Sequence, residues 1–189
     1  MMPVVIPGVP VRDRRHSRVL QQPLAAPRYG VMIHYDDSTR DDWAVAWFSD
    51  PRCTNGYTWL VLDDGAVIEL ADPAMRTPHA GPCLRPNANS VHYGIAAATN
   101  GYTLATAAQL DAIAECVTAV FAFYHWRGDS VSERIVGHDA QAVWTAAYTT
   151  NHALWGTLGR KVDPTGTRTD GVPIIDVTQL RREVARRLP

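Results

Sequence analysis

Three potential metal ligands lie where the sequence predicts that strands end. His34 follows the apolar run 31–33, His138 follows 135–137, and Asp163 lies directly before a proline. Residues at strand ends are held rigidly yet face a cleft, as a preorganised site requires. Two imidazoles and one carboxylate can bind zinc and leave its fourth position open for water. A histidine that ends a strand is more often a capped surface residue, so the residues alone leave both interpretations open.

The elements that must position these residues are indicated by the periodicity of apolar side chains. Short apolar runs predict strands, and two of them flank the turn signal Asp64-Gly65 as a hairpin. Apolar residues at helical spacing predict helices, most clearly after the capping box of Thr106 and Gln109. The pattern predicts an α/β fold, a single domain with a central mixed β-sheet flanked by helices. The strands are expected at about 29–34, 57–62, 66–70, 93–98 and 134–136, and the helices at about 38–47, 106–127, 139–148 and 176–188.

Helix ends and irregular segments can also be predicted. Ser38 and Thr39 are suited to cap the first helix, and Gly128 to end the long one. The stretch 72–91 contains four prolines and should be irregular, and loops of this length usually have a function. We expect residues 1–27, which carry prolines and a basic patch, to form an extended N-terminal arm, and residues 28–189 to form one domain without internal repeats.

The bulk composition limits the class of protein. The 189 residues are 46% hydrophobic and 20% charged, which is normal for one soluble globular domain. A net charge of −1 gives no strong attraction to nucleic acid, so no nucleic-acid partner is expected. Three widely spaced cysteines argue against a disulfide framework and a thiolate zinc cluster, and they suit a reducing compartment.

No segment of the sequence predicts a membrane span or a secretory signal. A span needs about 20 apolar residues, and no stretch approaches that length. The apolar N-terminus is interrupted by prolines and lacks a basic start, so we expect no signal peptide. The sequence therefore predicts a protein made in the cytoplasm, with no stable membrane insertion.

Six motifs in order along residues 31–164 resemble those of the zinc-dependent N-acetylmuramoyl-L-alanine amidases. This family includes phage lysozyme-type amidases, muropeptide-recycling amidases and animal peptidoglycan recognition proteins. The motifs are VMIHY at 31–35, NGYTWLVLDDG at 55–65, HAG at 79–81, NS with YGI at 89–95, RIVGHD at 134–139 and GRKVDP at 159–164.

The resemblance implies a Zn²⁺ enzyme with its site in a groove at the strand ends of a catalytic domain at 28–189. It implies that zinc, held by His34, His138 and Asp163, activates a water that cleaves the amide between N-acetylmuramic acid and L-alanine. Lys161 would stabilise the oxyanion, and a solvated loop lysine is the alternative. The resemblance also makes His79 and Asn89 substrate-binding residues, although a structural role for His79 is equally open.

Two departures from the family's pattern bear on mechanism. Recycling amidases carry a glutamate as general base after the Gly-Ile pair, and here that residue is Ala96, which cannot transfer a proton. Phage lysozyme-type members also lack the glutamate and use a tyrosine at the start of the hairpin, which Tyr57 matches; otherwise Tyr57 would be a packing residue. In addition, His138 and Asp163 are 25 positions apart, so His152, 11 positions before Asp163, is an alternative ligand.

The resemblance therefore predicts a monomeric endolysin that is made in the host bacterial cytoplasm and reaches the peptidoglycan at lysis. The alternatives are a cytoplasmic amidase that recycles muropeptides, and a non-catalytic peptidoglycan-binding protein. The basic residues of the terminal helix could attract anionic wall polymers, or they could simply form a solvated face. They are Arg181, Arg182, Arg186 and Arg187.

Overall fold

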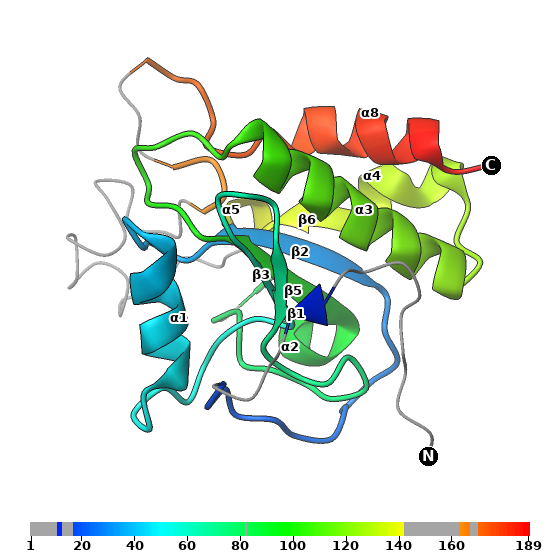
Figure 1. Ribbon diagram of the computed structural model, residues 1–189. Coiled ribbons are helices and arrows are strands. Elements are labelled where there is room, and N and C mark those ends of the chain that lie inside the picture. The colour runs from blue at the N-terminus through cyan, green and yellow to red at the C-terminus, as the bar shows by residue number, and fades with distance from the viewer. Residues whose placement is uncertain (1–10, 13–16, 82, 142–162, 167–169) are drawn as a thin grey trace.

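The computed structural model describes residues 11–12, 17–81, 83–141, 163–166 and 170–189 (Figure 1). In this part of the chain, strands form one six-stranded mixed sheet in the order β1-β4-β3-β5-β2-β6. Only β3 and β4 pair antiparallel, as the predicted hairpin, and the other neighbours are parallel. The strands are β1 (Val11–Arg12), β2 (Gly30–Tyr35), β3 (Trp59–Val61), β4 (Val67–Glu69), β5 (His92–Ala97) and β6 (Ile135–Gly137).

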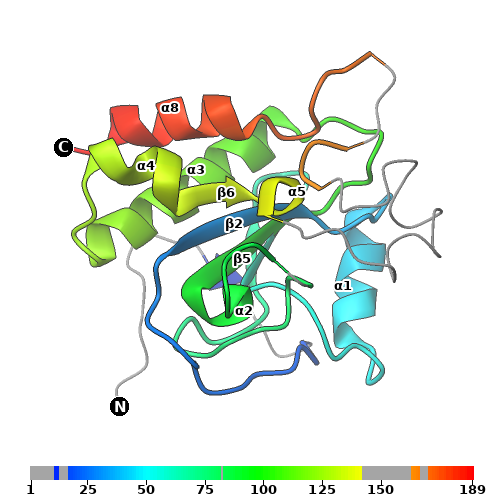
Figure 2. The ribbon, with the colours of Figure 1, turned by 180° about the vertical axis from the view of Figure 1, so that it is seen from behind.

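Helices cover the sheet, so the predicted α/β fold with a central mixed sheet is confirmed. Figures 1 and 2 show α3 and α8 side by side over one face of the sheet, while α1 lies away from this pair. No described helix has the length and apolar character needed to span a bilayer. The helices are α1 (Asp41–Ser49), α2 (Ala88–Val91), α3 (Ala107–Phe123), α4 (Val131–Arg134), α5 (His138–Gln141) and α8 (Val177–Arg187), with a 3-10 turn, η1, at Gly128–Ser130.

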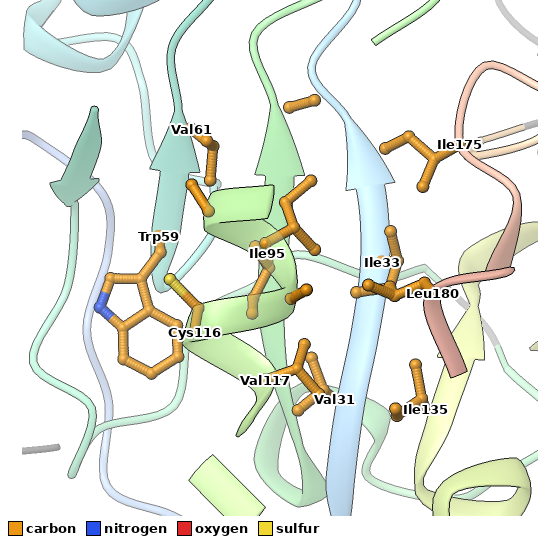
Figure 3. Packing of buried hydrophobic residues seen from close by; sticks show 14 of the residues in the cluster. Val31, Ile33, Trp59, Val61, Ile95, Cys116, Val117, Ile135, Ile175 and Leu180 are labelled. Atoms are coloured by element: carbon orange, nitrogen blue, oxygen red, sulfur yellow. The ribbon is translucent and has the colours of Figure 1, made fainter. Parts of the chain in front are cut away.

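Successive side chains along the central strands point alternately to the two faces of the sheet. In β2, Val31 and Ile33 belong to the core beneath α3 and α8, which Figure 3 shows. Since successive side chains of a strand point to opposite faces, His34 points to the other face. There a second core joins Ala44 and Phe48 of α1 to the sheet. Each fully buried aliphatic side chain contributes about 1.5–3 kcal/mol to folding, so this core fixes the orientation of His34 firmly.

Two of the predicted helix ends are wrong. The N-cap of α1 is Arg40, without a side-chain cap, because the hydroxyl of Ser38 donates to Asp36 instead. The helix α3 ends before Gly128 because His125 adopts the left-handed conformation, with φ of 54°. The amides of His125 and Trp126 then bond to the carbonyls of Ala122 and Phe121, and these two bonds form a Schellman motif.

The other differences concern short elements. The stretch expected to be irregular contains the one-turn helix α2, and α4 leads directly into β6. The helix expected at 139–148 begins one residue earlier, as α5, and its predicted continuation beyond Gln141 lies outside the described residues. The cap of α3 by Thr106 and Gln109 is confirmed, and Asp176 caps α8. The boundary of the N-terminal arm at residue 27 stays a prediction.

Candidate metal centre

Parallel pairing of β2 and β6 brings two histidines to the same edge of the sheet. Ile33 pairs with Gly137, so the next residues, His34 and His138, leave the two strands side by side. The carboxylate of Asp163 lies between them, with its Oδ2 atom 2.7 Å from His34 Nδ1 and 3.2 Å from His138 Nδ1. All three residues are buried, and one ligand atom from each lies within 4.8 Å of the others.

Backbone contacts hold Asp163 against the end of β6. The amide of Asp139 donates to the carbonyl of Asp163 at 2.6 Å, and the amide of Ile175 donates to the carbonyl of Pro164. A Cβ atom on Gly137 would lie 2.5 Å from the Asp139 carboxylate and 2.9 Å from Pro164 Cδ, so only glycine fits. This packing joins the segment that carries His138 to the segment that carries Asp163.

Electrostatics favour an ionised Asp163. Burial alone would raise the pKa of this carboxyl group. The charges and hydrogen bonds of His138 and His34 outweigh burial and hold the pKa of Asp163 well below its usual value. A carboxylate is therefore present in the cluster throughout the neutral pH range.

A chain of hydrogen bonds behind His34 assigns its tautomer. His34 Nε2 lies 3.1 Å from His79 Nδ1, and His79 Nε2 lies 3.3 Å from the carbonyl oxygen of His92. Burial and the neighbouring histidines lower the pKa of His79 well below 6.5, so its ring is neutral. The carbonyl can only accept, so His79 donates from Nε2 and accepts at Nδ1. His34 consequently donates from Nε2. In the neutral form of the His34 ring, Nδ1 therefore carries the lone pair and no proton.

This tautomer makes the cluster fit a metal ion. His34 Nδ1 lies 2.7 Å from a carboxylate oxygen, so either a proton, which makes the ring cationic and stabilises the carboxylate, or a bound metal cation belongs between the two atoms. In addition, His138 Nε2 is buried and has no hydrogen-bond partner among the described residues. Two imidazoles and one carboxylate are a donor set that zinc accepts, with one histidine supported by an outer partner. The residues present therefore fit Zn²⁺.

The loop that carries His79 is braced against the sheet. Asn89 accepts from the amides of His79 and Ala80 at 3.0 and 2.7 Å, and it donates to the Ala80 carbonyl. A Cβ atom on Gly94 of β5 would lie 2.7 Å from the His79 ring, so the glycine lets the imidazole reach the sheet. The structure thus places His79 behind His34, with part of its side chain on the groove. The amide of Asn89 is used to shape this loop, and substrate contact by either residue stays a prediction.

Tyr57 and Ala96 lie next to His34. The rings of Tyr57 and His34 are 5.0 Å apart, and the Tyr57 hydroxyl donates to the Tyr35 carbonyl at 3.3 Å. Burial raises the pKa of Tyr57 well above 10, and Asp163 adds to the rise, so the hydroxyl stays protonated and can donate but not act as a base. Ala96 pairs with His34 across β2 and β5 and is fully buried, so a methyl group occupies that position beside the site.

The cluster opens into a groove of about 720 Å³. Tyr57, His79 and Asp163 line one part of it, and two tryptophans of α1, Trp43 and Trp47, line another. The sequence predicted the helix but not that these two side chains face the site, although their i, i+4 spacing is a signal that they share a face. Two residues of the sequence-based site, Lys161 and the alternative ligand His152, lie outside the described residues.

Residues 25–166 match the family described as N-acetylmuramoyl-L-alanine amidase. The search of curated proteins gives no significant match.

Solved structures share the fold at low sequence identity. A selenomethionine derivative of AmpD has a TM-score of 0.65 and 16% identity, over 94% of each chain. The catalytic domain of XlyA has a TM-score of 0.52 and 12% identity, over 90% of this chain and 94% of its own. The Staphylococcus aureus hydrolase AmiA, in complex with its ligand, has a TM-score of 0.53 and 14% identity, over 84% of this chain and 73% of its own.

Proposed function

The chain belongs to the N-acetylmuramoyl-L-alanine amidase family, and on that premise we propose that it is a zinc-dependent hydrolase of peptidoglycan. It cleaves the amide between N-acetylmuramic acid and the L-alanine of the stem peptide. The observation that carries the proposal is the convergence of His34, His138 and Asp163, three buried donors at the edge of the substrate-sized groove. A complete ligand set also argues against a protein that only binds peptidoglycan.

The roles proposed for the described residues follow from their positions. Zn²⁺, when bound, lowers the pKa of a water molecule and polarises the amide carbonyl. The hydrogen bond between His79 and His34 Nε2 orients the His34 ring, so that Nδ1 faces Asp163 and would hold the ion together with that carboxylate. The protonated hydroxyl of Tyr57 turns from the Tyr35 carbonyl and donates a hydrogen bond to the oxygen on which negative charge develops. Lys161 lies outside the described residues, and its role, a positive charge at the same oxygen, rests on the sequence motif alone.

His138, rather than His152, is the second histidine ligand in this proposal. Its support is the direct packing of the β6 end against the segment of Asp163, where Gly137 contacts Pro164 and Asp139 bonds to Asp163. The test is the zinc content of purified His138→Ala and His152→Ala. The proposal expects zinc to be lost from the first variant and kept in the second; a zinc-free His152→Ala protein would reverse the assignment.

Within the family, we assign the chain to the endolysin type, which acts on the polymeric wall. Its support is Ala96, which puts a methyl group where the recycling amidases carry their glutamate, together with Tyr57 close to the His34 ring. The contrasting type acts on soluble anhydro-muropeptides. Turnover of purified sacculi well above turnover of soluble anhydro-muropeptides is expected, and the opposite preference would place the chain among the recycling enzymes.

The activity itself is tested on purified sacculi. The zinc-loaded protein should release new L-alanine amino groups, a chelator should abolish the release, and added zinc should restore it. His34→Ala is the matched control, because it removes one ligand and leaves the groove otherwise intact. Sacculi that stay intact in the presence of zinc and wild-type protein would refute the proposed function.

A further inference from the structure

The helix α1 leaves two large aromatic side chains in water. Trp43 and Trp47 are 58% and 48% exposed, although the same helix buries Ala44 and Phe48 against the sheet. Residues four positions apart lie on the same face of a helix, so the two indoles are neighbours. Exposed apolar surface of this size is often found where a protein binds a ligand.

The two indoles are continuous with the proposed active site. They line the same groove as Tyr57, His79 and Asp163, so a ligand bound at the metal cluster can extend along α1. The ring of Trp43 also lies beneath the guanidinium of Arg40, at 5.4 Å, and Arg40 is paired with Asp42 through two hydrogen bonds. This arrangement restricts the Trp43 ring before any ligand arrives.

The charge of the groove wall selects among the parts of the substrate. The groove wall is lined by Asp36 and Asp37, which come shortly before α1 in the sequence, while Asp163 belongs to the metal cluster. Arg40, the cation described next to this wall, is already paired with a carboxylate. A stem peptide carries carboxylates of its own and would be repelled by Asp36 and Asp37. An uncharged saccharide would not be repelled, and Ser38 and Asn55 in the groove have polar groups suited to its hydroxyl and acetamido substituents.

We propose that Trp43 and Trp47 form a subsite for the glycan strand of the substrate, with sugar rings stacked on the two indoles. The inference rests on the proposed function, because the amide to be cut is joined through an acyl group to a sugar, which must then lie next to the metal cluster. The faces of pyranose rings carry C–H groups, which pack on an aromatic face while the substituents stay at the polar edge. Two indoles one helical turn apart accept two neighbouring sugars, so the subsite favours polymer over a single muramoyl-peptide.

The direct test is binding of peptide-free glycan strands, prepared from GlcNAc–MurNAc polymer, to the full zinc-loaded chain by isothermal titration calorimetry. Wild-type protein should bind, and Trp43→Ala/Trp47→Ala should bind at least about tenfold more weakly, as expected for the loss of two aromatic contacts. Phe123→Ala on α3 is the matched control, since Phe123 is an exposed aromatic residue outside the groove, and its affinity should equal that of wild type. Trp43→Tyr/Trp47→Tyr should recover most of the binding.

A kinetic test separates the subsite from the catalytic residues. In the double alanine variant KM for sacculi should rise about tenfold or more while kcat and zinc content stay unchanged, because the rings contact substrate away from the scissile bond. Hydrolysis of a monosaccharide muramoyl-peptide should change less than hydrolysis of sacculi. Equal losses on both substrates would contradict a glycan subsite.

Four further results would overturn the proposal. Two concern peptide-free glycan: it does not bind wild-type protein, or it binds the double alanine variant equally well. The third is binding of free stem peptide that depends on the two tryptophans, and the fourth is a double alanine variant that loses binding to phosphatidylglycerol vesicles while its glycan binding is unchanged. Failure of the proposed function is distinct from these results. It would appear as wild-type protein that binds glycan through the tryptophans yet releases no L-alanine amino groups.

Discussion

Replacing His79 with alanine removes the partner of His34 Nε2 without touching any of the three proposed ligands. The lost hydrogen bond spans 3.1 Å between two buried rings. Leaving a buried ring N–H without an acceptor costs about 1–3 kcal/mol. Loss of the outer partner of a metal-binding histidine typically lowers metal affinity about 10–100-fold, which corresponds to about 1.4–2.7 kcal/mol. The two figures agree, so we expect the zinc Kd of His79→Ala to rise about 10–100-fold.

The assay is competition for zinc against a chromophoric chelator, with the unfolding midpoint of the metal-free protein measured in parallel. His79→Gln can still accept a hydrogen bond from His34 and should recover part of the affinity. His125→Asn is the matched control, because His125 is exposed, lies outside the site and has a left-handed conformation that asparagine tolerates. Zinc affinity within about threefold of wild type in His79→Ala, together with a lower unfolding midpoint, would refute the reasoning and leave His79 as a packing residue.

Three other predictions concern Gly137, Tyr57 and His92. Gly137→Ala places a Cβ atom 2.9 Å from Pro164 Cδ, so it should lower the zinc content and, by overpacking, lower the unfolding free energy by about 1–3 kcal/mol. In the control Gly128→Ala the Cβ atom meets nothing closer than 4.0 Å, so this variant should keep its zinc. Denaturant unfolding and metal analysis check this, and a zinc-replete Gly137→Ala protein would contradict it. Tyr57→Phe should lower kcat on sacculi about 10²–10³-fold with zinc content unchanged, since it removes one donor to the developing negative charge, and a wild-type kcat would exclude that role. Burial lowers the pKa of His92 to about 4, so the folded state binds fewer protons than the unfolded state between about pH 4 and 6.5. The unfolding free energy should therefore fall on acidification through this range, by up to about 3 kcal/mol. A pH series of urea titrations should show a smaller fall for His92→Asn, and an equal fall of the unfolding free energy in both proteins would contradict the assignment.

Much of the fold could be predicted from the sequence because local signals agree with the tertiary structure. The apolar runs of β2, β3 and β5 are buried on both faces, and the Thr106 capping box begins α3. The predicted ends of α1 and α3 were wrong because a side chain or backbone group there adopts another interaction or conformation than its local sequence preference suggests. Ser38 donates to Asp36 rather than capping α1, and His125 supplies a left-handed conformation for which a glycine was expected.

The candidate site was predictable to the extent that it depends on strand ends. The positions of His34 and His138 followed from runs that the sheet places in parallel, and Asp163 from its motif. The placement of His79 was not predictable, because its approach to His34 depends on a glycine in β5, on the brace by Asn89 and on the path of a long loop. These contacts join segments far apart in sequence, and periodicity carries no information about them.

The central claim is that His34, His138 and Asp163 hold one zinc ion. A crystal structure of the zinc-loaded protein, with diffraction data collected on both sides of the zinc absorption edge, tests it directly. We expect a single anomalous peak bonded to the three residues at about 2.0–2.2 Å. A peak elsewhere, or one with His152 in place of His138, would contradict it.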